Sequence, residues 1–187
     1  MQMNETLSVI RNRYSCRAFD ERPVGDDILR LIAEAGVQSP SGMNTQKWHI
    51  TVVSDKALLD EIEGAGLAEM NAMPDKTAID RINSRGGRLF YYAPVLIAVS
   101  IDATGGDLPL LDCGICVENM TIAAASLGLA SCICGLAGFA FQGENEKKFN
   151  EKLKFPPGYI LGMSILIGYE KNPGKPHEPD SGKITYI

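Results

Sequence analysis

Apolar runs and residues with helical spacing predict a mixed domain of strands and helices. Four apolar runs predict strands at residues 48–53, 93–100, 129–134 and 159–169. The run at 93–100 is apolar almost throughout, which is typical of a strand covered on both faces. Apolar positions that recur every three or four residues predict helices over 4–10, 26–36, 55–67, 108–128 and 144–153.

Polar residues and glycine mark the ends of three of these helices. Asn4 and Asp26 stand before apolar-periodic stretches and have side chains suited to capping a helix N-terminus. Asp55 begins the third helix. Gly36 is the predicted C-terminal stop of the second helix.

The helix over 108–128 is apolar nearly all round. Its strongly polar residues are Asp112, Glu118 and Asn119. A helix of this kind is buried at the centre of a domain or shared between subunits. Because a chain of 187 residues has few other elements to cover it on every side, the pattern predicts contact with a second subunit in a homodimer.

Two stretches lack a regular pattern. Residues 70–88 combine weak periodicity, mixed charge and two adjacent glycines, and we predict a mobile excursion with one helical turn at 78–82. Such a segment is either a substrate-facing lid or simply flexible. The tail over 170–187 begins with prolines and glycines. It ends in 183–187, which we predict to be an edge strand that pairs with the other subunit.

Composition narrows the class of protein. A chain of 187 residues with 45% hydrophobic content supports one domain over 1–187. Eighteen basic against 23 acidic residues give a net charge of −5, which argues against binding to nucleic acid or a membrane surface, since both need a basic face. No secretory signal and no uncharged apolar stretch of membrane-spanning length is evident, so we predict a cytoplasmic protein.

The five cysteines do not predict a metal site. Cys113, Cys116, Cys132 and Cys134 form a C-x-x-C and a C-x-C spacing, which is compatible with a zinc or iron–sulfur centre. Their neighbours are apolar, however, as expected of cysteine used as a small buried hydrophobic residue. Cys16 makes the count odd, which argues against a disulfide framework. A cysteine-ligated metal protein is the less favoured alternative.

A polar loop over 39–49 joins the second helix to the first long strand. Hydroxyl and carboxamide side chains surround Pro40 and Gly42 in this loop. Pro40 restricts the backbone, and Gly42 permits a tight bend. Taken alone, the pattern is typical of an ordinary helix-to-strand connection, and it is also compatible with a ligand-binding loop.

Arginines are concentrated upstream, at Arg11, Arg13 and Arg17. On an extended backbone, residues at this alternating spacing lie on one side. Arginine forks match phosphate oxygens, so the loop predicts an anion site. The alternative is a solvated basic loop whose arginines pair with the nearby acids Asp20, Glu21, Asp26 and Asp27.

Together the two loops resemble the signature motifs of the nitroreductase family of flavin enzymes. Residues 13–17, Arg-Tyr-Ser-Cys-Arg, match the family's Arg-Arg-Ser-x-Arg loop except at Tyr14. Residues 40–48 match its Pro-Ser-x-x-Asn-x-Gln-Pro-Trp loop, with Lys47 in place of a proline. The end of the long helix, the strand and turn after it, and a closing Gly-Tyr strand at 167–169 are also similar, so the likeness covers almost the whole chain.

The resemblance implies an α+β fold with a central, mostly antiparallel sheet flanked by helices. It implies an intertwined homodimer with a long buried central helix, FMN at each subunit interface, and the tail over 170–187 extended across the partner. The implied activity is an FMN-dependent oxidoreductase. It would take a hydride from NADH or NADPH and then reduce a small-molecule electron acceptor (a nitroaromatic, a quinone or a similar compound) in a ping-pong cycle. The alternatives are a related flavin reductase or dehalogenase-like enzyme with another acceptor, and a non-catalytic flavin-binding protein.

The resemblance also implies which residues hold FMN. One subunit would supply the arginine loop and its partner the loop after Pro40. A glycine turn near 134–136 would offer backbone N–H groups, and a Lys-x-His pair stands where the family has Lys-x-Arg, which weakens the positive charge near neutral pH. No catalytic side chain is expected, because the flavin carries the hydride chemistry. The implied cofactor-binding residues are Arg13, Tyr14, Ser15, Arg17, Pro40, Ser41, Gly42, Asn44, Gln46, Cys134, Gly135, Leu136, Lys175 and His177, with Asn83 and Arg88 as further candidates.

Overall fold

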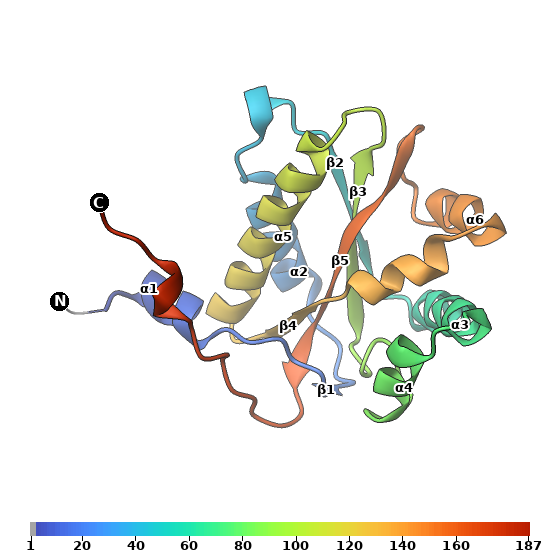
Figure 1. Cartoon of the computed structure of the whole chain (residues 1–187), viewed down its shortest axis with the longest axis horizontal. Helices are drawn as coiled ribbons and strands as arrows, with labels where there is room; N and C mark the ends of the chain where they lie inside the picture. The colour runs from blue at the N-terminus through green and yellow to red at the C-terminus, as the bar shows by residue number, and fades with distance from the viewer. Residues whose placement is uncertain (1–2) are drawn as a thin grey trace.

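The computed structural model describes residues 3–187 and has the α+β architecture that the sequence predicts (Figure 1). Four strands follow the order β1-β5-β3-β2, and β4 also pairs with β5. Each of these strand pairs is antiparallel. The strands are β1 (Phe19–Asp20), β2 (Trp48–Val53), β3 (Val95–Asp102), β4 (Ala130–Ile133) and β5 (Tyr159–Glu170).

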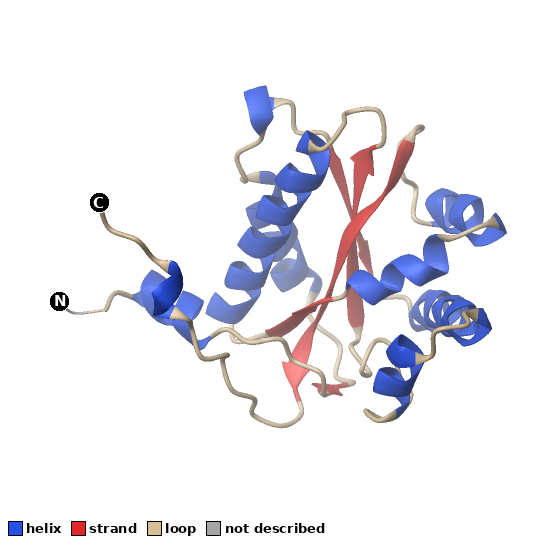
Figure 2. Ribbon diagram, viewed as in Figure 1, coloured by secondary structure: helices blue, strands red, loops and turns tan. Residues whose placement is uncertain are grey.

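Helices cover both faces of the sheet (Figure 2). α2 (Asp26–Val37) and α5 (Leu108–Ser126) pack on one face, and their apolar side chains form one core cluster with β3 and β5. The other face packs against a second cluster from the helices α3 (Lys56–Ala72), α4 (Thr77–Asn83) and α6 (Glu144–Lys152) and the 3₁₀ helix η2 (Gly135–Phe141). The remaining helices are α1 (Glu5–Asn12), η1 (Gly42–Asn44) and η3 (Ser181–Lys183).

Alternation along β3 divides the interior into these two cores. Val95, Ile97 and Val99 belong to the cluster under α2 and α5. Leu96 and Ala98 belong to the cluster under α3 and η2. Successive side chains of a strand point to opposite faces, and both faces are covered here. Every residue of β3 before its last is therefore buried, which explains the nearly continuous apolar run in the sequence.

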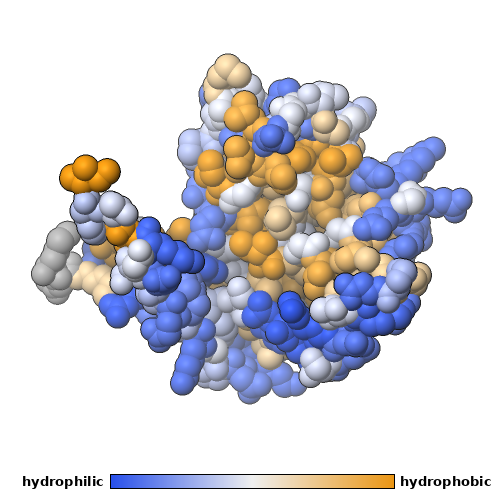
Figure 3. All heavy atoms as spheres, in the orientation of Figure 1, coloured by the Kyte–Doolittle hydropathy of each residue, from blue (hydrophilic) through white to orange (hydrophobic). Residues whose placement is uncertain are grey.

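Only one side of α5 is covered within the single chain. Its buried residues include Cys113, Cys116, Val117, Met120 and Ala124, which face the sheet. Its other side leaves a row of apolar side chains exposed, and Figure 3 shows a broad apolar surface in this region; the row consists of Leu108, Leu110, Leu111 and Ile115. α5 is long and apolar enough to span a membrane, judged by length and composition alone. The buried core helices of soluble proteins share these properties, and 44% of the most apolar stretch of α5 is buried in the domain.

The helical turn predicted at 78–82 is confirmed, but the prediction that the rest of 70–88 lacks regular structure is wrong. α3 continues to Ala72, and α4 forms a second helix at Thr77–Asn83. Met70, Ile79 and Ile82 are buried in the core beneath these helices. Ile79 and Ile82 are three residues apart and therefore share one face of α4, a signal too short to stand out among the charged residues around it.

Two of the predicted helix ends are confirmed and two are wrong. The Asn4 side chain accepts a hydrogen bond from the Leu7 N–H at 2.9 Å, as an N-cap should. Asp55 likewise caps α3. Gly25 rather than Asp26 occupies the N-cap of α2, and Gly36 lies inside that helix instead of ending it. A methyl group on Gly36 would lie 2.8 Å from the Ile50 side chain, so this glycine permits close packing of α2 on the sheet.

The predicted edge strand at 183–187 does not form in the single chain. A 3₁₀ turn, η3, occupies Ser181–Lys183, and the residues after it are exposed, among them Ile184, Tyr186 and Ile187. Figure 1 shows the tail leaving the body of the domain on the same side as α1. Among residues 3–187, therefore, none covers the exposed apolar end of the tail.

Candidate functional site

The arginine loop begins at the end of α1. Arg11 belongs to the last turn of that helix, so the predicted row of three arginines on an extended loop is wrong. Arg13 is the C-cap residue, and its Nε lies 3.4 Å from Oε1 of Glu118 on α5. Arg13 is largely covered, with 19% of its side chain exposed, whereas Arg17 is exposed. Of the three arginines, Arg13 and Arg17 therefore remain as candidates for an anion site.

Residues 15–17 run alongside β4. Ser15 forms a parallel bridge with Ser131, and the Cys16 N–H donates to the Ser131 carbonyl at 2.8 Å. Cys16 is buried, so the extended backbone turns Ser15 and Arg17 outward. Arg17 Nη1 donates to the Ser15 carbonyl at 3.4 Å, which keeps the two exposed groups together. This local arrangement leaves a hydroxyl and a guanidinium on one side of the loop.

The acids near the loop in sequence do not neutralise its arginines. Asp20 pairs with Arg22 at 3.8 Å, and Glu21 lies 4.0 Å from Lys56. Arg13 instead pairs with Glu118, more than one hundred residues away. The alternative of a basic loop paired with its neighbouring acids is therefore not what the structure shows.

Tyr14 joins this loop to the C-terminal tail. Its hydroxyl donates a hydrogen bond to the Glu170 carboxylate, and burial together with this bond raises the pKa of the phenol. The Tyr14 ring lies so close to Gly174 that a methyl group there would overlap it. Lys175 and His177 follow in the exposed tail. The structure thus brings the start of the tail to the arginine loop. A hollow of about 310 Å³ beside it is lined by Arg13, Tyr14, Ser131 and Glu170, among others.

The second loop contains three residues in the left-handed region of the backbone. Met43, Asn44 and Gln46 have φ values of 52°, 55° and 49°, so the bend lies after Gly42 and not at it. Internal bonds support the turn: the Gln46 N–H donates to Ser41 Oγ at 3.0 Å, and Gln46 Nε2 donates to Asn44 Oδ1 at 3.0 Å. Pro40, Asn44 and Gln46 are exposed.

Lys47, which stands in place of the family's proline, makes an ion pair at the end of this loop. Its Nζ lies 2.8 Å from Oδ2 of Asp102 at the end of β3. The hydrogen bond raises the pKa of Lys47 and, with bonds from Thr104, lowers that of Asp102. Lysine at this position therefore lacks the backbone restriction of a proline, but its side chain attaches the end of the loop to β3.

The two loops lie at opposite ends of α5 (Figure 1). The Gly42 N–H donates to both carboxylate oxygens of Asp112, at 3.1 and 3.2 Å, near the start of the helix. Arg13 contacts Glu118, six residues further along. In the sequence, Asp112 and Glu118 differ from their neighbours only as polar residues on an apolar helix, and this pattern predicts no role for them. Within one chain the two predicted halves of the site are separate.

The turn after β4 differs in part from the prediction. The Cys134 N–H donates to the Ser164 carbonyl at 2.8 Å and is therefore not available to a ligand. The Cys134 carbonyl accepts from Ser164 Oγ at 2.8 Å, and burial raises the pKa of the Cys134 thiol to about 12. Cys134 thus has a structural role. Gly135 is exposed, with open space at its Cα, and remains a candidate for close approach by a ligand. Leu136 is half-buried at the start of η2.

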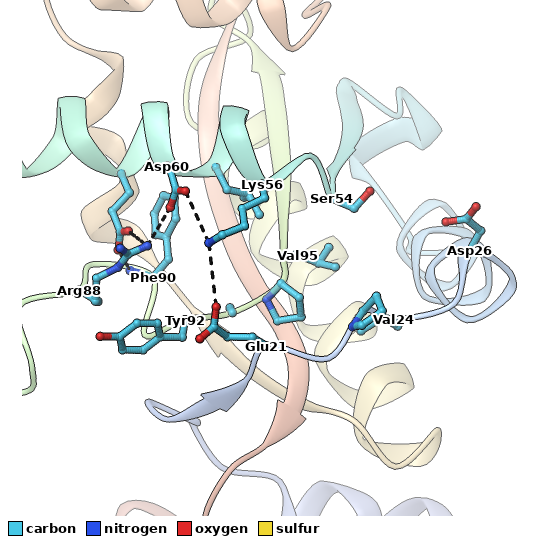
Figure 4. Close-up of a pocket in the computed structure, with 15 residues that line it drawn as sticks. Glu21, Val24, Asp26, Ser54, Lys56, Asp60, Arg88, Phe90, Tyr92 and Val95 are labelled. Carbon is cyan, nitrogen blue, oxygen red and sulfur yellow. Dashed lines mark hydrogen bonds and ion pairs between the residues drawn. The ribbon is translucent and has the colours of Figure 1, made fainter.

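Arg88 belongs to a different part of the molecule. It lines a cavity of about 350 Å³ between α3 and the segments that precede α2 and β3 (Figure 4). Its Nη2 lies 2.6 Å from Oε2 of Glu63 and 2.9 Å from Oδ1 of Asp60, and Glu63 also accepts from the Phe90 N–H at 2.7 Å. Arg88 is therefore engaged in an ion-pair network. None of the cofactor-binding residues predicted in the loops and tail lines this cavity.

All five cysteines are buried thiols. Burial raises the pKa of Cys113 and of Cys116 to about 12. Within residues 3–187, no three His, Cys, Asp or Glu side chains are grouped closely enough to hold a metal ion.

Comparison with known proteins places this geometry in a family. The sequence profile of the Nitroreductase family matches residues 10–169. A nitroreductase with bound FMN from Desulfitobacterium hafniense DCB-2 is 48% identical, with a TM-score of 0.98 and complete coverage of both chains. A nitroreductase with bound FMN from Bacteroides fragilis NCTC 9343 is 30% identical, with a TM-score of 0.90 over 99% of this chain and 100% of that one.

A curated relative extends the likeness to an archaeon. The putative NADH dehydrogenase/NAD(P)H nitroreductase of Archaeoglobus fulgidus is 26% identical over 182 residues, which is 95% of this chain and 92% of that protein. The similarity therefore runs the length of the domain and includes both signature loops. Because the family profile matches most of the chain and a relative with 48% identity shares its fold from end to end, this chain belongs to the Nitroreductase family.

Proposed function

We propose that this protein is an FMN-dependent oxidoreductase that takes electrons from NADH or NADPH and passes them to a small-molecule acceptor such as a nitroaromatic or a quinone. This proposal rests on membership of the Nitroreductase family. The exposed Ser15 and Arg17, close to Arg13, support it. Two similar structures contain bound FMN, and a 28% identical relative from Bacillus subtilis is named FMN reductase [NAD(P)H].

The residues of the arginine loop fit the phosphate of FMN. That phosphate carries nearly two negative charges, and a protein with a net charge of −5 needs a local concentration of cations to bind it. Arg13 and Arg17 supply guanidinium groups, and Ser15 supplies a hydroxyl. The tail docked on Tyr14 brings Lys175 and His177 to the same region. These residues, rather than the Arg88 network, are the proposed phosphate contacts.

The second loop also has free capacity for a ligand or a second chain. Pro40, Asn44 and Gln46 present exposed groups. Within residues 3–187, the Ser39 hydroxyl is buried without a hydrogen-bond partner. A buried hydroxyl that lacks a partner is unfavourable for stability.

The complete site requires two copies of the chain. The second loop bonds to Asp112 near the start of α5, and the arginine loop lies beside the C-terminal end of this helix, where Arg13 and Ala125 line the same hollow, so one molecule does not bring the loops together. The apolar side chains along the uncovered side of α5, with Met43 at the tip of η1, would be removed from water in a homodimer. The exposed apolar end of the tail over 170–187 would lie on the partner. We propose that each FMN lies at such an interface.

FMN, when bound, supplies the hydride acceptor and donor, so the protein has to bind, orient and shield it rather than provide an acid or base. Arg13 and Arg17 would hold its phosphate, and Gly135 would allow close approach of the backbone. The acceptor compound and a cytoplasmic location stay predictions.

The visible spectrum of the purified protein tests this proposal. We expect a yellow protein, or an apoprotein that becomes yellow when FMN is added, with one FMN per chain. Anaerobic addition of NADH or NADPH should bleach the flavin absorption, and a quinone should restore it. The molar mass in solution should be twice the chain mass of 20.2 kDa. A protein that does not bind FMN would refute the proposal, and a flavin that neither nucleotide reduces would identify a non-catalytic flavin-binding protein.

A further inference from the structure

A buried carboxylate on α5 holds the second loop. Asp112 is only 5% exposed, yet both its oxygens lie within hydrogen-bond distance of the Gly42 N–H, 70 residues earlier in the chain. A hydrogen bond to a charged acceptor in a buried setting is stronger than a neutral one. The contact joins the first turns of α5 directly to the backbone of η1.

The loop needs such support, because its backbone is strained. Met43, Asn44 and Gln46 all have left-handed φ values, which are unfavourable for residues with a Cβ atom. The bonds from Gln46 to Ser41 and to Asn44 close the turn on itself and do not attach it to the domain.

Asp112 is the attachment. Within residues 3–187, the Gly42–Asp112 bond is the hydrogen bond that links residues 41–46 to any residue outside the loop. The ion pair of Lys47 with Asp102 fixes only the exit of the loop into β2. Without Asp112, the turn would keep its internal bonds and lose its orientation relative to α5.

We infer that Asp112 is a positioning residue, which orients the loop over 41–46 so that Ser41, Asn44 and Gln46 are presented together for cofactor binding. The carboxylate acts through Gly42 and does not itself contact the cofactor. This inference rests on the proposed FMN function, but its effect on the loop exists in the protein without FMN. The two can therefore be tested separately.

Four variants separate positioning from general stability. Asp112→Ala and Asp112→Leu both remove the acceptor, and the leucine also fills the space of the aspartate side chain and suits an apolar helix. Asp112→Asn keeps an acceptor oxygen for the Gly42 N–H and removes the charge. Asp107→Ala is the control, because Asp107 is an exposed aspartate at the start of the same helix and makes no side-chain cap bond.

Hydrogen exchange of the apoprotein measures the loop, and fluorescence titration with FMN measures binding. We expect faster exchange at residues 41–46 and at least tenfold weaker FMN binding in Asp112→Ala and Asp112→Leu. Asp112→Asn should rescue both to within about threefold of the wild type, since it retains the hydrogen bond, and Asp107→Ala should change neither.

Specific outcomes would overturn the inference. Unchanged exchange at 41–46 in Asp112→Ala and Asp112→Leu would show that the loop does not depend on this carboxylate. Faster exchange over the whole domain in both variants, without rescue by asparagine, would show a role in stability only. Faster loop exchange with unchanged FMN affinity would refute positioning for cofactor binding. A wild type that binds no FMN would refute the proposed function, while the exchange data would still decide whether Asp112 holds the loop.

Discussion

The Tyr14 hydroxyl donates a hydrogen bond to the Glu170 carboxylate at the end of β5. This bond and the contact of the Tyr14 ring with Gly174 fasten the start of the tail beside the arginine loop. Tyrosine at this position, where the family motif has arginine, thus has a structural role within the chain. It sets the direction in which the exposed tail leaves the domain.

The tail contact predicts the effect of a single methyl group. Gly174→Ala would place a Cβ inside the Tyr14 ring, so the tail must move away from the arginine loop. We expect faster proteolysis at Lys175 and weaker FMN binding, with a small change in melting temperature because the tail is exposed. Gly64→Ala is the control, since a Cβ at this exposed position of α3 meets no atom within 4 Å. Equal protease sensitivity in the two variants would contradict the docking of the tail.

Removing either arginine of the first loop should weaken FMN binding. Arg13→Ala or Arg17→Ala deletes a charge-assisted contact worth about 2 kcal/mol, or about 30-fold in Kd, measured by flavin fluorescence. Arg30→Ala on α2 is the control, because this arginine is exposed and its ion pair, with Glu34 at 3.9 Å, is also solvent-exposed. If both loop variants bind FMN as tightly as the Arg30 variant, the loop does not hold the phosphate.

The ion pair of Glu63 and Arg88, both of which line the cavity of Figure 4, should matter for stability. The Glu63 side chain is 4% exposed and bonds both Arg88 and the Phe90 N–H. Glu63→Ala would leave the Phe90 N–H without a partner and reduce Arg88 to its pair with Asp60, and we expect a loss of about 2 kcal/mol in the free energy of unfolding by urea. Glu61→Ala on the same helix removes pairs with Lys148 and Lys152 that are solvent-accessible, so its cost should be clearly smaller than that of Glu63→Ala. Equal costs would contradict the special role of Glu63.

The ion pair of Lys47 and Asp102 should make stability depend on pH. The pKa of Asp102 is lowered in the folded protein, so its contribution is present above the unfolded-state pKa of about 3.9 and is lost as pH falls through the folded-state pKa. The pKa of Lys47 is raised, so its contribution is lost only in strongly alkaline solution. The stability difference between wild type and Lys47→Met should therefore be constant above about pH 5 and shrink as the pH falls below about 4. The control Lys147→Met removes a weak pair at 4.0 Å and should show little pH dependence.

The buried thiols should react slowly with disulfide reagents. Burial raises the pKa of Cys113, Cys116 and Cys134 to about 12, which lowers their thiolate fraction at about pH 8 by about a thousandfold relative to a free cysteine. Ellman's reagent should find these thiols unreactive in the folded protein and should find all five cysteines after denaturation. Rapid labelling of Cys134 in the folded protein would contradict its structural role.

Local patterns predicted the elements that have strong periodicity. The strand at 48–53, the Asn4 cap and the apolar character of the helix now seen at Leu108–Ser126 all follow from spacing and residue type. At 70–88 the helical turn was predicted, but its packing on the core was not, because two isoleucines on one face of a short helix give too weak a pattern. The prediction failed at Arg11, where the first helix continues through the residue.

The sequence by itself predicted the strands and the strongly periodic helices from residue type at short spacing, and the resemblance of its two loops to the family's motifs implied the fold class and the family. Only the tertiary structure decided how the loops are held. Asp112 and Glu118 reach Gly42 and Arg13 across 70 and 105 residues, and a contact at that separation leaves no local periodic signal. The tertiary structure also placed the loops at opposite ends of α5, because the path of the chain around the sheet, and not the loop sequences, sets their distance.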